Sequence, residues 1–130
     1  MVSHDVDVDA NVIRITIVGP TDLPGFTATI NALWSDPRLC EGMGILGDFT
    51  RVEGIATLDV AYECVRVTAR LIERIGPFRS AIVHSRPANA GITNAASVFA
   101  RSIGGLELRS FYDLSDATAW LAEGRPGLAS

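Results

Sequence analysis

The sequence predicts an α/β domain in which a mostly parallel sheet of four or five strands carries about four helices. Short apolar runs alternate along the chain with longer amphipathic segments, and strands that alternate with helices are typical of parallel sheets with right-handed crossovers. One unit shows the plan: residues 44–48 form a short buried strand, residues 57–75 form an amphipathic helix, and Gly76-Pro77 ends the helix. The 130 residues are enough for one domain with its own core.

The N-terminal part of the chain contains two predicted strands. Asp and Val alternate over residues 5–9, which predicts either an antiparallel edge strand or a solvated tail. Residues 12–18 are rich in β-branched side chains and form a strand that Gly19-Pro20 ends. The expected organisation is an N-terminal edge strand or tail (1–11), an α/β domain (12–124) and a C-terminal tail (125–130).

The first two helices are predicted by their caps and by apolar residues spaced three or four apart. Thr21 or Asp22 caps the first helix, and Asp36-Pro37 stops it. Thr57 caps the long helix over residues 57–75. The residues expected to face the core are Phe26, Ile30, Leu33 and Trp34 in the first helix and Leu58, Ala61, Val65, Ala69, Ile72 and Ile75 in the second.

The C-terminal half repeats the strand–helix pattern twice. Residues 81–83 form a short apolar strand that ends at His84, and residues 106–111 form another strand. Asp113 or Ser115 caps the last helix. The residues expected to face the core are Ile92, Ala95, Ala96, Phe99 and Ile103 in the helix between these strands and Ala117, Trp120 and Leu121 in the last helix.

Composition and charge exclude several classes of function. The net charge of −4 argues against nucleic acid and anionic membrane surfaces as partners. No apolar run approaches the ~18 residues that a membrane span needs. Cys40 and Cys64 are isolated thiols, so we expect a reduced, cytoplasmic location. Histidines, cysteines and carboxylates do not cluster in the sequence, and we therefore expect neither a metal nor another cofactor.

Four sequence features carry a family resemblance. They are the strand 12–18 followed by Gly19 and a helix, the sequence Ile45-Leu46-Gly47-Asp48-Phe49-Thr50 before the long helix, the strand Ala81-Ile82-Val83 before a helix with Gly and Ala, and the closing Phe111-Tyr112-Asp113-Leu114, Asp116-Ala117 and Ala119-Trp120-Leu121. Together they resemble the STAS-like, or SpoIIAA-like (anti-sigma-factor-antagonist-like), domains. The closing pattern is similar to the compact bacterial branch of STAS/SEC14-like proteins.

This resemblance implies a small cytosolic module that is not an enzyme and acts by binding a protein or a ligand. In the family, a serine in an Asp-Ser-Ser-Gly type turn at the start of the long helix is phosphorylated by a partner kinase. Thr57 falls near that position, but the Asp, the second Ser and the Gly are absent from Ala56-Thr57-Leu58-Asp59. Thr57 is therefore a candidate phosphosite, and a helix cap is its alternative role.

Candidate site residues follow from the rule that sites in α/β sheets lie beyond the carboxyl ends of parallel strands. Asp48, His84, Ser85 and Arg86 are predicted at that edge and are candidates for ligand binding. Arg86 and the helix N-termini would suit an anion. In the alternative interpretation, Asp48 forms a turn, Ser85 or Asn89 caps a helix, and Arg86 is a solvated charge.

Three functions remain open on these residues. The first is a non-enzymatic regulatory module that binds a protein partner, a second copy in a homodimer, or a small ligand. The second is a carrier of a small apolar or lipid-like ligand, which predicts an enclosed cavity of ~300 Å³ or more. The third is a small hydrolase or transferase, in which Asp48 and His84 form an acid/base pair and Ser85 is the nucleophile. The sequence contains no nucleophile-elbow or Gly-rich phosphate motif.

Overall fold

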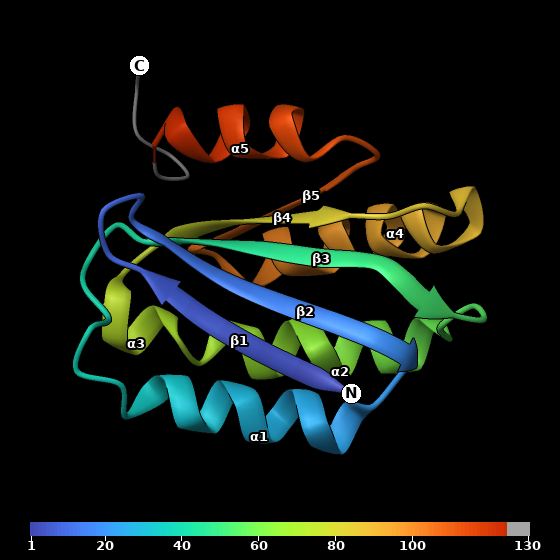
Figure 1. Cartoon of the computed structure of the whole chain (residues 1–130), viewed down its shortest axis with the longest axis horizontal. Coiled ribbons are helices and arrows are strands. Elements are labelled where there is room, and N and C mark those ends of the chain that lie inside the picture. The colour runs from blue at the N-terminus through green and yellow to red at the C-terminus, as the bar shows by residue number, and fades with distance from the viewer. Residues whose placement is uncertain (125–130) are drawn as a thin grey trace.

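The computed structural model of the chain describes residues 1–124 and contains five strands and five helices (Figure 1). The strands are β1 (Val2–Asp7), β2 (Val12–Pro20), β3 (Gly44–Glu53), β4 (Phe78–Val83) and β5 (Leu106–Phe111). The helices are α1 (Leu23–Trp34), α2 (Leu58–Ala69), α3 (Ile72–Ile75), α4 (Pro87–Ile103) and α5 (Leu114–Ala122). The tail predicted at residues 125–130 lies outside the described residues.

The five strands form one sheet in the order β1-β2-β3-β4-β5. β1 pairs antiparallel with β2, and the other three pairs are parallel. Val6 of β1 lies opposite Ile13 of β2 and is buried. The predicted mostly parallel sheet and its antiparallel N-terminal edge strand are therefore confirmed.

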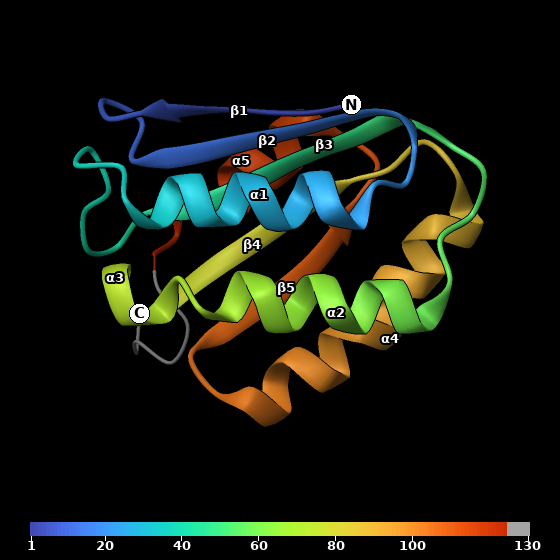
Figure 2. The same ribbon diagram turned by 90° about the horizontal axis from the view of Figure 1, so that it is seen from below.

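The helices cover the two faces of the sheet unequally. α1, α2 and α4 lie side by side on one face, with α2 between the other two, whereas α5 covers the opposite face (Figures 1 and 2). The larger core lies beneath the three helices and includes Ile13, Ile15, Ile45 and Phe78. A smaller core beneath α5 includes Leu46, Ala81, Val83 and Trp120. The central strands are thus buried on both faces, as expected for parallel strands.

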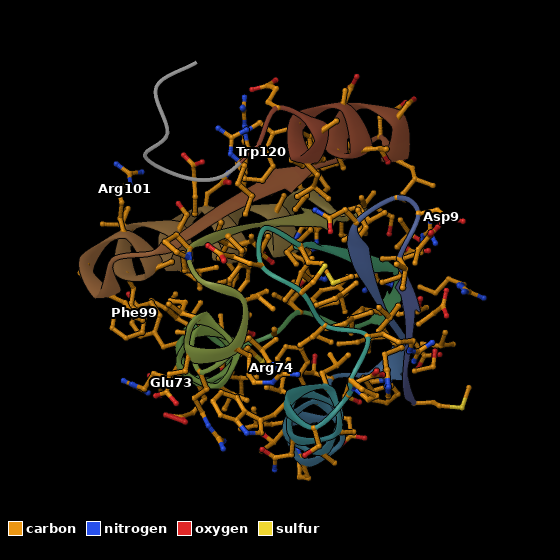
Figure 3. All side chains as sticks on the ribbon, turned by 90° about the vertical axis from the view of Figure 1, so that its left-hand side faces the viewer. Asp9, Glu73, Arg74, Phe99, Arg101 and Trp120 are labelled. Carbon is orange, nitrogen blue, oxygen red and sulfur yellow. The ribbon has the colours of Figure 1, made fainter. Side chains whose placement is uncertain are left out.

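The single helix predicted over residues 57–75 is wrong, because the chain forms α2 and the one-turn α3 instead. Between them the hydrogen bonds step back only three residues: Leu71 N–H donates to the Thr68 carbonyl over 3.0 Å. This tighter turn places Leu71 and Ile75 in the core, where both are fully buried. Arg74 of α3 donates through Nε to the Trp34 carbonyl at 2.7 Å and so fixes the end of α1 (Figure 3).

Side-chain caps begin three of the helices, as the sequence predicts. Asp22 accepts a hydrogen bond from Gly25 N–H, and Thr57 accepts one from Val60 N–H. Asp113 rather than Ser115 caps α5. An N-terminal cap satisfies a backbone N–H that has no partner within the helix.

The inward face of α4 differs from the prediction. Ile103 is 40% exposed, and the buried residues of α4 are Asn89, Ala90, Ala96 and Ala100. Small side chains let the helix lie close to the sheet, while the larger Phe99 packs sideways against Tyr62 of α2, with ring centroids 4.9 Å apart. Of the residues expected to face the core, Ala96 is buried, whereas Ala95 and Ile103 are exposed.

One arginine attaches α5 to the sheet. Arg79 of β4 donates through Nη1 to the Trp120 carbonyl at 2.9 Å, and its guanidinium carbon lies 4.8 Å from the centre of the Trp120 ring. The same guanidinium forms ion pairs with Glu107 and Glu123. The position of α5 therefore depends on a cation–π contact and a hydrogen bond as well as on its apolar face.

Candidate functional site

A cavity of about 100 Å³ lies between the sheet and the helices α1, α2 and α4. We call it the central cavity. Strands β2 to β5 form its floor, and side chains from the three helices form its roof. Most of the lining is apolar, including Ile15, Ile17, Phe26, Ile45, Phe49, Val52, Val65, Ile82, Ile92, Leu106 and Leu108. A concave, mostly apolar site with few polar groups is the usual form of a small-molecule site.

A β-bulge in β3 shapes one wall of the cavity. Thr16 of β2 lies opposite Asp48, whereas Val18 lies opposite Arg51, so that β3 has one residue more than β2 between these pairs. Asp48 Oδ1 stabilises the bulge by accepting hydrogen bonds from the Thr50 N–H at 3.1 Å and from the Thr50 hydroxyl at 2.7 Å. The bulge shifts the alternation of the strand, and Phe49 and Val52 therefore both face the cavity.

Gly47 keeps space open in the same wall. A Cβ atom at this position would lie 2.7 Å from Ile82 Cδ1 and 3.2 Å from Phe49 Cε1. Both distances are shorter than ordinary van der Waals contact. The missing side chain of Gly47 therefore allows two larger side chains, Ile82 and Phe49, to line the cavity.

His84 and Thr93 form a polar pair in the cavity wall. His84 Nε2 lies 2.7 Å from Thr93 Oγ1, and the imidazole packs edge-on against the Phe49 ring, with centroids 6.0 Å apart. His84 is only 5% exposed. Burial disfavours the charged imidazolium and lowers the pKa of His84 from its ordinary 6.5 to about 4. The ring is therefore neutral at pH 7 and has one donor and one acceptor.

Asn89 holds the loop that closes one end of the cavity. This β3–α2 loop consists of residues 54–57, and its Ala56 lines the cavity. Asn89 Oδ1 accepts a hydrogen bond from Ala56 N–H at 3.1 Å, and its Nδ2 donates to the Gly54 carbonyl at 2.9 Å. A buried side chain of α4 therefore supplies a donor and an acceptor to a loop that contributes few apolar contacts.

The Asn89→Ala substitution should lower the free energy of unfolding by about 1–2 kcal/mol, because it removes two partly buried hydrogen bonds. The amide of Ala56, whose N–H donates to Asn89, should also exchange with deuterium faster than in the wild-type chain. Urea unfolding and hydrogen exchange followed by NMR test both effects. Asn31→Ala, at an exposed position of α1, is the control. Equal stability and exchange in the two variants would show that Asn89 does not hold the loop.

The predicted site residues lie near one another, but they do not form a catalytic arrangement. Among the described residues, no hydrogen bond joins Asp48, His84 and Ser85 to one another. Ser85 Oγ donates instead to the Thr50 carbonyl at 2.8 Å. Asp48 was expected at the end of its strand, but it lies within β3, because the bulge lets the strand continue to Glu53.

Arg86 and Thr57 each lie at the N-cap position of a helix. Arg86 is the exposed N-cap residue of α4, and its side chain makes no capping hydrogen bond. Neither Ser85 nor Asn89 caps α4, so that expectation was wrong; Pro87 begins the helix, and its side chain leaves no N–H there to be capped. Thr57 is exposed and caps α2.

The sequence did not indicate three residues of the cavity: Phe49, Thr93, and Asn89 in its role of holding the β3–α2 loop. Thr93 is nine positions from His84, and the pairing requires a turn between β4 and α4 that the sequence does not specify. A hydrogen-bonding role for Asn89 could have been predicted, because it is a polar residue on the inward face of a helix, where burying an unpaired amide would be costly.

Cys64 lines the cavity as well and is partly buried. Burial raises the pKa of its thiol to about 11, so the thiol is protonated at pH 7. Within residues 1–124, no group of three or more His, Cys, Asp or Glu side chains is placed to hold a metal ion. In the same part of the chain, no helix has the length and apolarity to cross a membrane.

Comparison with known proteins bears on the fold. A solved structure similar to this chain is the crystal structure of an uncharacterized protein from the DUF3478 family, with a SpoIIAA-like fold, from Shewanella loihica PV-4. The two chains are 19% identical, the TM-score is 0.62, and the match covers 93% of this chain and 92% of that chain. No family model matches the sequence, and no curated protein matches it. The structural match confirms the predicted fold: this chain has the SpoIIAA-like fold.

Proposed function

We propose that the chain is a non-enzymatic binding module that holds a small apolar ligand in the central cavity. The observation that carries this proposal is the cavity itself, which is already formed between the sheet and three helices. Its lining is apolar apart from a few hydroxyl, thiol, amide and imidazole groups. Sites for small molecules are usually preformed in this way, with a few polar groups that orient the ligand.

The size of the cavity supports a ligand smaller than a lipid. Its volume of about 100 Å³ is below the ~300 Å³ of typical pockets for drug-sized molecules. It is of the same order as an engineered apolar cavity of about 150 Å³ that binds benzene. A ligand of roughly one ring is therefore favoured over a molecule with long acyl chains.

The hydrogen bonds of the candidate residues support binding rather than chemistry. An acid/base pair needs His84 within hydrogen-bond reach of the partner carboxylate or of the nucleophile. His84 Nε2 is paired with Thr93, and Ser85 donates to a backbone carbonyl. The low pKa of His84 also makes the ring a weak base at neutral pH.

A contact with a partner protein or a second copy is the second candidate function. Ile55 and Leu58 are 62% and 37% exposed and flank the capping Thr57. Ile55 adjoins Ala56, which lines the cavity. A ligand in the cavity would therefore change the packing beneath this surface, which supports a regulatory role. A phosphate on Thr57 would be stabilised by its position at a helix N-terminus.

The two free cysteines suit a cytoplasmic location.

The Ala61→Leu substitution should weaken ligand binding about tenfold or more, because Ala61 of α2 lines the cavity and a larger side chain fills it. Toluene is a suitable probe, and its binding is measured from amide chemical shifts in an NMR titration. In the wild-type chain the shifts should concentrate on residues that line the cavity.

Ala95→Leu is the matched control, because Ala95 is exposed on α4 and does not line the cavity. This variant should bind toluene as the wild-type chain does. Shifts that are scattered over the surface, or equal binding by the Ala61→Leu variant, would overturn the proposal.

A further inference from the structure

We infer that the ligand of the central cavity is a neutral, mainly apolar molecule with one hydrogen-bonding group, such as a hydroxyl, and that His84 determines this specificity. The inference rests on the proposed function and defines the chemical class of the ligand. Its basis is the His84–Thr93 pair, the absence of charge from the cavity wall, and the rigid setting of the imidazole.

The pair retains unused hydrogen-bonding capacity in either tautomer. A neutral imidazole has one donor and one acceptor, and a threonine hydroxyl has one donor and two acceptor lone pairs. If Nε2–H donates to Thr93, then Nδ1 remains an acceptor and the hydroxyl remains a donor. If Nε2 accepts from Thr93, then Nδ1–H remains a donor and the hydroxyl oxygen remains an acceptor. In both cases one donor and one acceptor remain on two side chains that line the cavity.

The donor and the acceptor that the His84–Thr93 pair leaves unused are accessible rather than fully buried. Among the described residues, the side chains of His84 and Thr93 make no second hydrogen bond, and no fully buried side-chain nitrogen or oxygen lacks a partner. The second ring nitrogen of His84 therefore retains accessible surface, although the residue is 5% exposed, and both side chains line the cavity. A polar group at this place can be satisfied by a bound molecule.

The uncharged lining of the cavity excludes ionised ligands. Among the described residues that line the cavity, none is an Asp, Glu, Lys or Arg. An ionised ligand would therefore be transferred from water into an apolar site without a counter-charge, which costs far more than burying a neutral group. The imidazole is itself neutral at pH 7, so it recognises a neutral partner through hydrogen bonding alone.

The surroundings of His84 fix its ring before any ligand arrives. Its backbone N–H donates to the Phe111 carbonyl at 2.8 Å, its ring nitrogen is held by Thr93 of α4, and its edge packs on Phe49. A group that is already oriented loses little freedom on binding and so contributes more to affinity and selectivity. By contrast, the amide of Asn89 is committed to the β3–α2 loop through both its oxygen and its nitrogen.

Phenol and toluene are the probes that test this inference, because they share one ring and differ mainly in a hydroxyl in place of a methyl group. Dissociation constants for both are measured by NMR titration in the wild-type chain and in the His84→Phe and His4→Phe variants. His4 is exposed on β1 and does not line the cavity, so His4→Phe, which makes the same substitution elsewhere, is the matched control. Phenol binding should weaken about tenfold relative to toluene in His84→Phe, since the phenol hydroxyl loses its partner, and the ratio should be unchanged in His4→Phe.

A second measurement does not depend on the folding of any variant. In the wild-type chain, phenol should shift the ring nitrogen resonances of His84 in a histidine-selective NMR spectrum, and toluene should leave them nearly in place. Benzoate at pH 7 should bind neither the wild-type chain nor the variants.

The outcomes separate the two levels of the proposal. If neither phenol nor toluene binds the wild-type chain, the proposed function fails. If both bind and Ala61→Leu excludes both, but His84→Phe leaves their ratio unchanged, the cavity is a binding site and the role of His84 is overturned. An equal loss of selectivity in His4→Phe would show that the effect is not specific to His84 and would overturn its role, and benzoate binding as tight as that of phenol would overturn the requirement for a neutral ligand.

Discussion

Replacing Phe78 with alanine is expected to lower the free energy of unfolding by about 3–5 kcal/mol, the usual range for deleting a buried aromatic ring. Phe78 is the first residue of β4, is 1% exposed and is the largest of the fully buried side chains. It belongs to the larger core beneath α1, α2 and α4. Such a loss would be a large part of the 5–15 kcal/mol that stabilises an ordinary domain.

Urea unfolding followed by circular dichroism measures this effect. Tyr112→Ala removes an aromatic ring that is 63% exposed and is expected to change the stability by less than about 0.5 kcal/mol. If Phe78→Ala does not fold, Phe78→Leu provides the measurement, with an expected loss of about 1–2 kcal/mol. Similar losses for Phe78→Ala and Tyr112→Ala would contradict the position of Phe78 in the core.

Lowering the pH from 6.5 to 4 is expected to remove about 2–3 kcal/mol of stability through His84. The pKa of His84 is about 4 in the folded chain, against an ordinary value of 6.5. Between these two values the unfolded chain binds a proton that the folded chain does not bind, so stability falls as the pH falls. The contribution is complete above pH 6.5 and is lost as the pH approaches 4.

Comparison with the His84→Phe variant isolates this effect, because phenylalanine does not titrate. The difference in stability between the two chains should change by about 2–3 kcal/mol from pH 7 to pH 4 and then level off. Hydrogen bonds lower the pKa values of Asp7, Asp36 and Asp113 in the folded chain, and the stability that these carboxylates add is lost mainly at lower pH, as they become protonated. Parallel stability profiles from pH 7 to pH 4 would show that His84 is not buried in its neutral form.

The fold was predictable because local signals agreed with one another. β-Branched runs marked the strands, capping residues such as Asp22 and Thr57 marked the helix starts, and the alternation of strands with helices indicated a parallel sheet. The errors arose where tertiary packing decides between local alternatives. The sequence contains no break near Arg70, and the three-residue step before Leu71 is favoured only because it buries Leu71 and Ile75 together.

The candidate site was predictable in part. The rule that sites lie beyond the strand ends pointed to His84, because it depends only on where a strand ends. Thr93 and Phe49 could not be predicted, because their positions depend on the rotation of α4 and on a bulge that interrupts the alternation of β3. Asp48 shows the same limit: the sequence made it a candidate for ligand binding, and in the structure its carboxylate accepts hydrogen bonds from Thr50 within the bulge.

The bulge in β3 has a consequence for the tolerance of the chain to changes in length. Before the bulge, the residues that face the cavity are two positions apart, as in Ile45, Gly47 and Phe49. Across the bulge the spacing is three positions, from Phe49 to Val52. Inserting one residue between positions 48 and 51 would turn Arg51 inward and Val52 outward, because the bulge accommodates only one extra residue. The segment is therefore a fixed spacer whose length specifies which residues form the interior, whereas a change in the neighbouring loop would leave that assignment intact.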